Sequence, residues 1–188
     1  MRSRIIMAAA EEIKFRGFKF TMSDLVKRIN ISKSSLYEHF SSKNELVSTL
    51  IDMALEDIFK QEEMIYNNFE MSIEQKFQSL IIVSPVLFGP LSDRIYDDLR
   101  KVFPEEWKRV EDFRQERLDR MISLLEKGVE SHNIQPTNFK VLKQLIIGAM
   151  NDLFDYRFLV ENNMTYHDAM VALAKIIVSG LTENPKNC

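Results

Sequence analysis

Apolar residues recur at every third or fourth position along most of the chain, and no stretch keeps the strict alternation of a half-buried strand. This spacing predicts an all-α protein. Glycine and proline number only five each and fall mostly between the helical stretches, where they end helices. We expect about nine helices: one ending near residue 17, then residues 21–30, 32–40, 42–66, 72–84, 91–103, 104–129, 137–162 and 166–181.

The second and third of these helices are short and are bounded by capping residues. Thr21 can accept a hydrogen bond from a free backbone N–H of the first turn, and Asp24 favours the positive end of the same helix. Asn30 suits the left-handed conformation that ends a helix, and Ser32 caps the helix that follows. Two short helices joined by such a tight turn form the shape that enters the major groove of DNA.

The helix of residues 32–40 has an apolar side and a polar side. Leu36 and Phe40 lie four positions apart and must face inward. A serine-to-glutamate spacing, Ser42 to Glu45, predicts a capping box at the start of the next helix. Polar residues on one helix face usually form only a solvated surface. The hydroxyl, lysine, tyrosine and histidine side chains of the helix of residues 32–40 together suit a DNA backbone. The candidate DNA contacts are Thr21, Ser32, Lys33, Ser34, Ser35, Tyr37, His39 and Lys43.

The charge of the chain is divided unevenly. Residues 1–50 hold nine Lys and Arg against five Asp and Glu, a net charge of +4, whereas the whole chain carries −3 and the remainder therefore −7. A basic N-terminal part on an acidic body is expected when only the N-terminal part meets DNA, because phosphates would repel the rest. Chance asymmetry in an ordinary globular protein is the alternative.

The first fifty residues resemble the DNA-binding domain of the TetR family of transcriptional regulators. The resemblance rests on Ala9, Ala10 and Gly17-Phe18 of the first helix, Thr21, Leu25-Val26, the turn Asn30-Ile31-Ser32, the stretch 35–40 and the stretch 42–46. It implies a three-helix helix-turn-helix domain over residues 1–46. It also implies a larger helical domain over residues 47–188 that dimerises and binds a small molecule.

The last two predicted helices are apolar around most of their circumference. A helix with two apolar faces needs two partners, and a second subunit can supply one of them through a four-helix contact about a two-fold axis. The alternative is that both helices lie at the centre of one monomer's core. The candidate dimer-interface residues are Leu145, Ala149, Leu153, Ala169, Ala172, Leu173 and Ile176.

Thirteen phenylalanines and ten methionines supply many adaptable apolar side chains. Such residues at helical spacing are most often ordinary core, but some can line a site for a small, largely apolar effector. The candidate ligand-binding residues are Phe77, Leu80, Phe88, Trp107, Phe113, Met121, Asn151, Phe154 and Phe158. The resemblance then implies a homodimeric regulator, a repressor by expectation, that leaves an inverted-repeat DNA site when the effector binds.

Catalysis is not expected. The chain has one cysteine, Cys188, and three widely separated histidines, His39, His132 and His167, without metal-ligand spacing. We identify no candidate catalytic residue, metal ligand or cofactor motif. A helical homodimer that binds a small molecule without binding DNA is the alternative function, which burial or acid pairing of Lys33, Tyr37 and Lys43 would favour.

The chain shows no sign of export or membrane insertion. No apolar segment follows the basic residues after Met1, and the apolar stretches are broken well before the ~20 residues that a membrane span requires. We expect a cytoplasmic protein that does not contact a membrane. Its expected partners are double-stranded DNA, a second copy of the chain and an effector of unknown identity.

Overall fold

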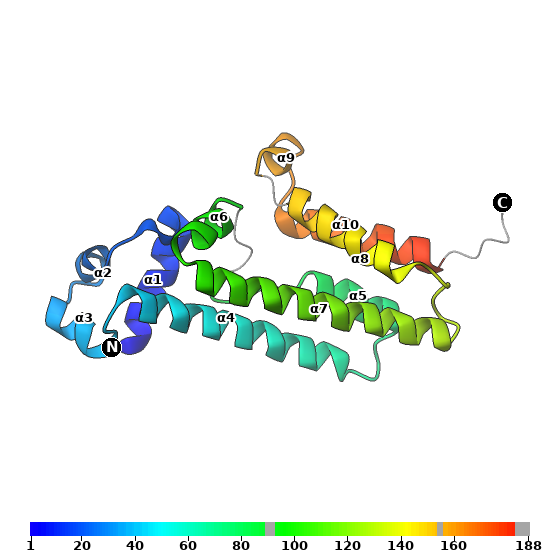
Figure 1. Cartoon of the computed structure of the whole chain (residues 1–188), viewed down its shortest axis with the longest axis horizontal. Helices are drawn as coiled ribbons and strands as arrows, with labels where there is room; N and C mark the ends of the chain where they lie inside the picture. The colour runs from blue at the N-terminus through cyan, green and yellow to red at the C-terminus, as the bar shows by residue number, and fades with distance from the viewer. Residues whose placement is uncertain (89–92, 154–155, 183–188) are drawn as a thin grey trace. The chain divides into compact units, whose positions relative to one another are not determined.

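The computed structural model describes residues 1–88, 93–153 and 156–182, and every regular element in these ranges is helical (Figure 1). The predicted all-α fold class is confirmed. The elements are α1 (Arg2–Arg16), the 3-10 helix η1 (Gly17–Lys19), α2 (Met22–Ile29), α3 (Lys33–His39), α4 (Lys43–Tyr66), α5 (Ile73–Ile81), α6 (Asp93–Val102), α7 (Pro104–Glu130), α8 (Phe139–Leu153), α9 (Tyr156–Glu161) and α10 (Tyr166–Thr182).

The chain divides into two compact units. The first comprises residues 1–59 and 84–112, and the second comprises residues 60–83 and 113–188. Two helices, α4 and α7, contribute residues to both units. The predicted functional boundary between residues 46 and 47 lies within the first unit and stays a prediction.

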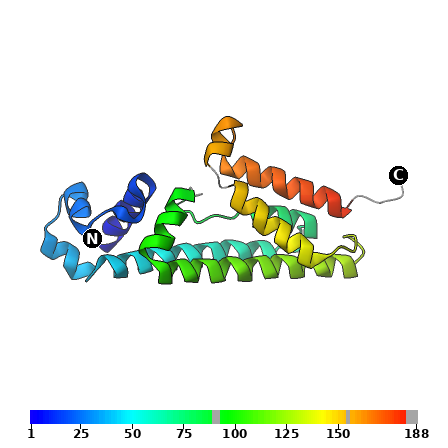
Figure 2. The same cartoon turned by 45° about the horizontal axis from the view of Figure 1, so that its top comes forward.

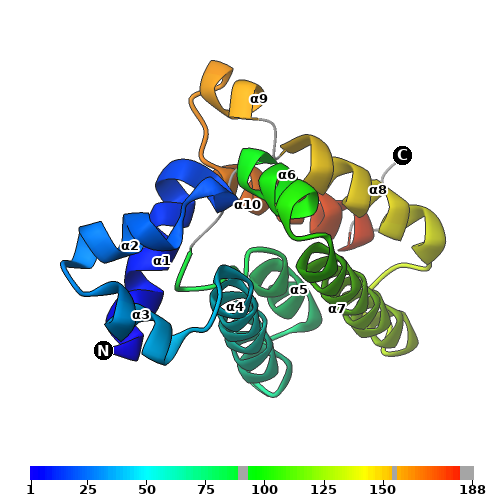
Figure 3. The ribbon, with the colours of Figure 1, turned by 60° about the vertical axis from the view of Figure 1, so that its left-hand side comes forward.

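The first unit is built around the N-terminal helices, which Figure 3 shows grouped beside the beginning of α4. Its core contains fully buried aromatic and aliphatic side chains from α1, η1, α2, α3 and α4, and the α6 segment adds Leu99 and Phe103. The Phe18 and Phe103 rings meet edge to face with their centroids 5.8 Å apart. This apolar burial, the main favourable term in folding, fixes the helices that carry the candidate DNA contacts.

The second unit has a separate hydrophobic core. Its α10 helix packs on both α5 and α8, and Figure 2 shows α8 and α10 as neighbours. The core buries Phe77, Leu80, Leu125, Ile146 and Met170. In the described ranges, no helix has the length and apolar character needed to cross a bilayer.

The structure differs from the sequence prediction near the C-terminus. The single helix expected over residues 137–162 is divided into α8 and α9, so that ten α-helices are described instead of nine. The apolar pattern gives no sign of this division, because Phe158, Leu159 and Val160 continue the run of apolar residues.

Candidate functional site

The two short helices of the predicted DNA-binding motif are formed and capped as expected. Thr21 and Asp24 make a reciprocal capping box, in which the Thr21 hydroxyl accepts from the Asp24 N–H and the Asp24 carboxylate accepts from the Thr21 N–H. Asn30 ends α2 in the left-handed conformation with φ 52°. The Ser32 hydroxyl accepts from the Ser35 N–H at 3.0 Å and so begins α3. Local hydrogen bonds therefore set the turn between the two helices.

Helix α3 has an exposed polar face and a buried apolar face. Leu36 and Phe40 are fully buried in the core of the first unit. Lys33, Ser34 and Tyr37 are exposed, with 49% of the Tyr37 side chain accessible. Ser32 and Thr21 are also exposed, whereas Ser35 and His39 are half-buried. Hydroxyls and an ammonium group on one short helix are donors suited to phosphate oxygens and base edges.

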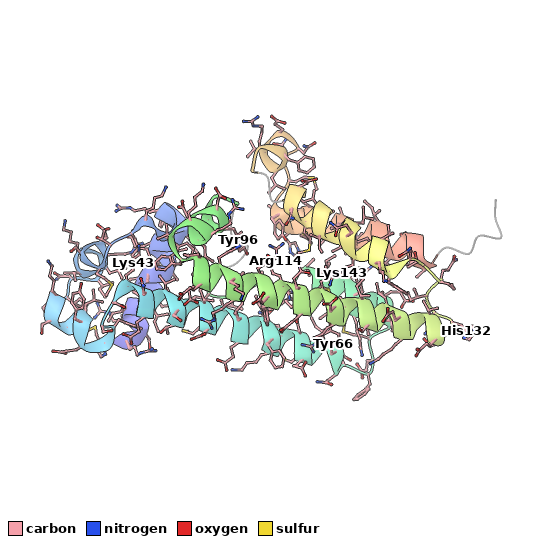
Figure 4. The ribbon with its side chains drawn as sticks, viewed as in Figure 1. Lys43, Tyr66, Tyr96, Arg114, His132 and Lys143 are labelled. Atoms are coloured by element: carbon pink, nitrogen blue, oxygen red, sulfur yellow. The ribbon has the colours of Figure 1, made fainter. Side chains whose placement is uncertain are left out.

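Lys43 takes a different position from the one expected. Its ammonium donates to the carbonyl oxygen of Phe18 at 2.5 Å and lies over the rings of Phe20 and Phe103 (Figure 4). Burial lowers the pKa of the Lys43 ammonium. The charge therefore faces the protein, because the carbonyl and the two ring faces compete with solvent for it.

The start of α4 also differs in one detail from the predicted capping box. The Ser42 hydroxyl accepts from the Glu45 N–H as expected, at 3.1 Å. The Glu45 carboxylate, however, accepts from the N–H and the hydroxyl of Ser41 instead of from Ser42. These two bonds lower the pKa of Glu45, because they favour the ionised form.

Ion pairs within the first unit engage some of the basic side chains of residues 1–50. Arg28 pairs with Glu11 and with the buried Glu12, and Lys19 pairs with the buried Asp98 at 3.3 Å. In the part of the chain that the structure describes, Lys27 and Lys33 have no acidic group within 4.0 Å and are exposed. The cations available for phosphate contact therefore include one on α2 and one on α3.

The candidate dimer-interface residues divide into exposed and buried groups. Leu145 and Ile176 are 59% and 71% exposed, and the neighbouring Val141 is 62% exposed. A β-carbon added at Gly148 or Gly180 would meet nothing within 4 Å. Ala149, Leu153, Ala172 and Leu173 are half-buried, whereas Ala169 is buried within its own protomer. The exposed members give α8 and α10 an apolar face.

The candidate ligand-binding residues are divided between the cores of the two units. Phe88 and Trp107 belong to the core of the first unit, whereas Phe77, Leu80 and Met121 belong to that of the second. Phe113 is half-buried, Asn151 is exposed and Phe158 is 40% exposed. Phe154 lies outside the described residues. Apolar spacing alone could not separate core from pocket, because both use the same side chains.

A cleft in the second unit is lined by one of the candidates, Met121, and lies beside a second, Asn151. It lies among α5, α7 and α8, and its free space is about 30 Å³, room for about two or three water molecules. Its lining residues are Ile81, Arg114, Gln115, Arg117, Leu118, Met121, Ile147 and Met150. Arg114 also donates to the Asn151 amide oxygen at 3.3 Å.

Two arginines of this cleft are not among the ligand-binding residues predicted from the sequence. Arg114 and Arg117 lie three positions apart on α7, on the helix face that also carries Leu118 and Met121. Side chains at this spacing share a face. Two cations on an otherwise apolar face were the signal that could have identified the cleft.

Comparisons with known proteins agree on one family. Residues 5–50 match the sequence model of the bacterial regulatory proteins of the tetR family. YvaF of Bacillus subtilis, an uncharacterized HTH-type transcriptional regulator, is 25% identical over 182 residues, which cover 97% of this chain and 96% of that protein.

Solved structures share the fold over nearly the whole length. A TetR-family transcriptional regulator from Agrobacterium tumefaciens superimposes with a TM-score of 0.72 and 16% identity, covering 97% of each chain. The ketosteroid transcriptional regulator KstR2 of Mycobacterium tuberculosis gives a TM-score of 0.69 and 18% identity, covering 97% of this chain and 95% of its own. Residues 5–50 therefore carry the N-terminal domain of the tetR family, and the comparisons together support a TetR-like transcriptional regulator.

Proposed function

We propose that this regulator binds an inverted-repeat DNA site as a homodimer, with α3 of each protomer in the major groove. The observation that carries the proposal is the exposed face of Lys33, Ser34 and Tyr37, which rests on the buried Leu36 and Phe40. Thr21 and Ser32 at the two helix starts supply further hydroxyls for phosphate contact. Lys43 supports the domain from inside instead of contacting DNA.

Dimerisation supplies the second reading helix. One short helix makes few base contacts, and two helices held one DNA turn apart, roughly 34–36 Å, read both halves of a palindrome. The exposed apolar residues Val141, Leu145 and Ile176 on α8 and α10 form a surface that a second copy can cover. A two-fold axis would bring the same residues of both protomers together.

Regulators of this family bind DNA as dimers and respond to small molecules. For this chain we propose a repressor in the cytoplasm that a small, largely apolar effector releases from DNA. The cleft at Met121 and Met150 is the candidate effector site, because its lining is mainly apolar and includes a few polar side chains. Release requires that the effector bind the two shapes of the dimer with different affinities.

The test is a selection of genomic fragments by the purified full chain, followed by mobility-shift titration in moderate salt. We expect at least one fragment bound far more tightly than random DNA of the same length. Binding of every fragment no better than random DNA would contradict the regulatory function. The alternative, a ligand-binding helical dimer without DNA-binding activity, would then be favoured.

The positions of three side chains bear on that alternative. Burial of Lys33 and Tyr37 would have favoured it, and both are exposed. Lys43 alone is turned inward. Two of the three side chains are therefore exposed, which supports DNA binding.

A further inference from the structure

We propose that the cleft of the second unit binds an anionic amphipathic ligand, such as an organic carboxylate, sulfonate or phosphate with an apolar body, and that its acid group competes with Glu62 for Arg117. This inference rests on the proposed function only in taking the cleft as the effector site. It adds the chemical class of the effector and the residue that links the effector to α4.

The chemistry of the lining supports this class of ligand. Five of the eight lining side chains are apolar, and the three polar ones, Arg114, Gln115 and Arg117, are all N–H donors. Among the residues that the structure describes, no acidic side chain lines the cleft. A guanidinium binds carboxylate and phosphate oxygens through two parallel N–H bonds. An apolar body with one acid group fits this distribution of donors and apolar surface.

Arg117 joins the cleft to a buried acid on another helix. Its Nε donates to the Glu62 carboxylate at 2.5 Å, and its terminal nitrogen contacts the Leu80 and Val83 carbonyl oxygens at 3.3 and 3.5 Å. Glu62 is fully buried on α4. The same guanidinium therefore belongs both to the lining of the cleft and to an ion pair with α4.

The pairing of Glu62 is incomplete. Its second carboxylate oxygen has no hydrogen-bond partner, and the next cation, Arg120, lies 3.9 Å away. A buried carboxylate depends on its cation, because an unpaired charge is costly in a low-dielectric interior. An anionic ligand at Arg117 would compete with Glu62 for the same positive charge. Ligand binding would therefore weaken the ion pair between Arg117 and Glu62 on α4.

The charged residues next to Glu62 form a separate ion pair. Arg120 pairs with Glu63 and covers the Tyr66 ring, with 4.4 Å between the guanidinium carbon and the ring centroid. Lys76 donates to the Tyr66 carbonyl oxygen at 2.8 Å. Burial and the charge of Glu62 raise the pKa of the Tyr66 phenol to about 12. Neither Glu63 nor Arg120 lines the cleft, so Glu63 provides a matched control for Glu62.

The free space of the cleft sets one requirement on binding. Because the free space holds only about two or three water molecules, an organic ligand must displace lining side chains. Met121 and Met150 can make this room, since an unbranched thioether chain adapts its rotamers readily. The apolar part of the ligand would then replace contacts that these side chains now make.

The test uses two fluorescent probes that differ only in the acid group, 8-anilino-1-naphthalenesulfonate and N-phenyl-1-naphthylamine. Their affinities are measured for the full chain and for Glu62→Gln, Glu63→Gln and the double variant Glu62→Gln/Arg117→Gln. Arg117→Gln alone would remove the hydrogen-bonded cation of Glu62, leave only Arg120 at 3.9 Å, and can unfold the protein. The double variant replaces both members of the ion pair with neutral amides, and circular dichroism melting verifies that each variant is folded.

We expect Glu62→Gln to tighten binding of the sulfonate about tenfold, because Arg117 loses its competing acid. The neutral probe should change less than about twofold in the same variant, and Glu63→Gln should leave both probes within about twofold. The double variant should not show this increase in affinity for the sulfonate. An unchanged sulfonate affinity in Glu62→Gln, an equal gain in Glu63→Gln or an equal gain for the neutral probe would overturn the proposal.

These measurements contain no DNA, so the two proposals fail separately. A chain that gives the expected pattern with the probes but binds no DNA fragment would contradict the proposed function alone. A chain that binds DNA selectively but shows no specific effect of Glu62→Gln would contradict only the anionic ligand site.

Discussion

The Asp98 carboxylate lies against the backbone of Gly17 so closely that a β-carbon at residue 17 would overlap one of its oxygens. Gly17 ends α1 with a positive φ of 65°, which a residue with a side chain adopts only at a cost. Asp98 is buried, and its other oxygen pairs with Lys19 at 3.3 Å. This contact joins α6 to the end of α1 within the first unit.

We predict that Gly17→Ala lowers the free energy of unfolding by about 2 kcal/mol, because the alanine would combine an unfavourable φ with a steric overlap. Urea unfolding followed by circular dichroism measures the effect. Gly180→Ala is the control, since its β-carbon would meet nothing within 4 Å on a helix, and it should stabilise by about 0.5 kcal/mol. Equal stability of Gly17→Ala and the parent chain would refute the close contact.

A second prediction concerns Lys33 on the exposed face of α3. Lys33→Ala should weaken binding to the selected DNA and reduce the slope of log affinity against log salt by about one, because one phosphate contact is lost. Anisotropy titrations at several salt concentrations measure both quantities. Lys14→Ala removes the same charge from an exposed position on α1 and should leave the slope unchanged. A slope that is the same in Lys33→Ala and the parent chain would place Lys33 away from the phosphates.

Asp24 gives a prediction for acid conditions. Hydrogen bonds from the Thr21 hydroxyl and N–H lower the pKa of Asp24 below its ordinary 3.8. Its contribution to stability is therefore present above the unfolded value and is lost as the pH falls through the folded value. Asp24→Asn should lower the melting temperature at pH 7 and leave it less sensitive to acidification toward pH 2.

The matched control for Asp24 is Asp152→Asn on α8. Asp152 is exposed and, in the described part of the chain, its carboxylate makes no hydrogen bond or ion pair. Its melting curves should follow those of the parent chain at both pH values. A melting temperature of Asp24→Asn that falls with acid as steeply as that of the parent chain would contradict the role of the cap.

The apolar face of α8 and α10 provides the prediction for assembly. Ile176→Asp should shift the sedimentation equilibrium from dimer to monomer, because the charge would be buried without a partner in the interface. The circular dichroism spectrum should stay helical, since Ile176 is 71% exposed in the single chain. Phe69→Asp is the control: Phe69 is 96% exposed between α4 and α5. If both variants remain dimeric, another surface mediates assembly.

The parts of the fold that the sequence could predict are those held by near neighbours. The caps at Thr21, Ser32 and Ser42 each depend on a residue three positions away, and such spacing is visible in the sequence. The exposed face of α3 follows from the same periodicity, because Leu36 and Phe40 identify the buried side.

The parts that could not be predicted depend on residues far apart in the sequence. Lys43 faces inward because the Phe18 carbonyl and the Phe103 ring, 25 and 60 positions away, meet its ammonium. Arg117 and Glu62 are 55 positions apart. No local pattern indicates which acid a given arginine will meet, so the cleft and its ion pair required the folded chain.

In the proposed complex, two α3 helices read two half-sites together. Anisotropy titration of the full chain against a selected fragment, and against the same fragment with one half-site scrambled, measures whether both half-sites contribute. We predict saturation at two protomers per fragment and a loss of at least about a hundredfold in affinity when one half-site is scrambled. Equal affinity for the intact and the scrambled fragment would contradict the claim.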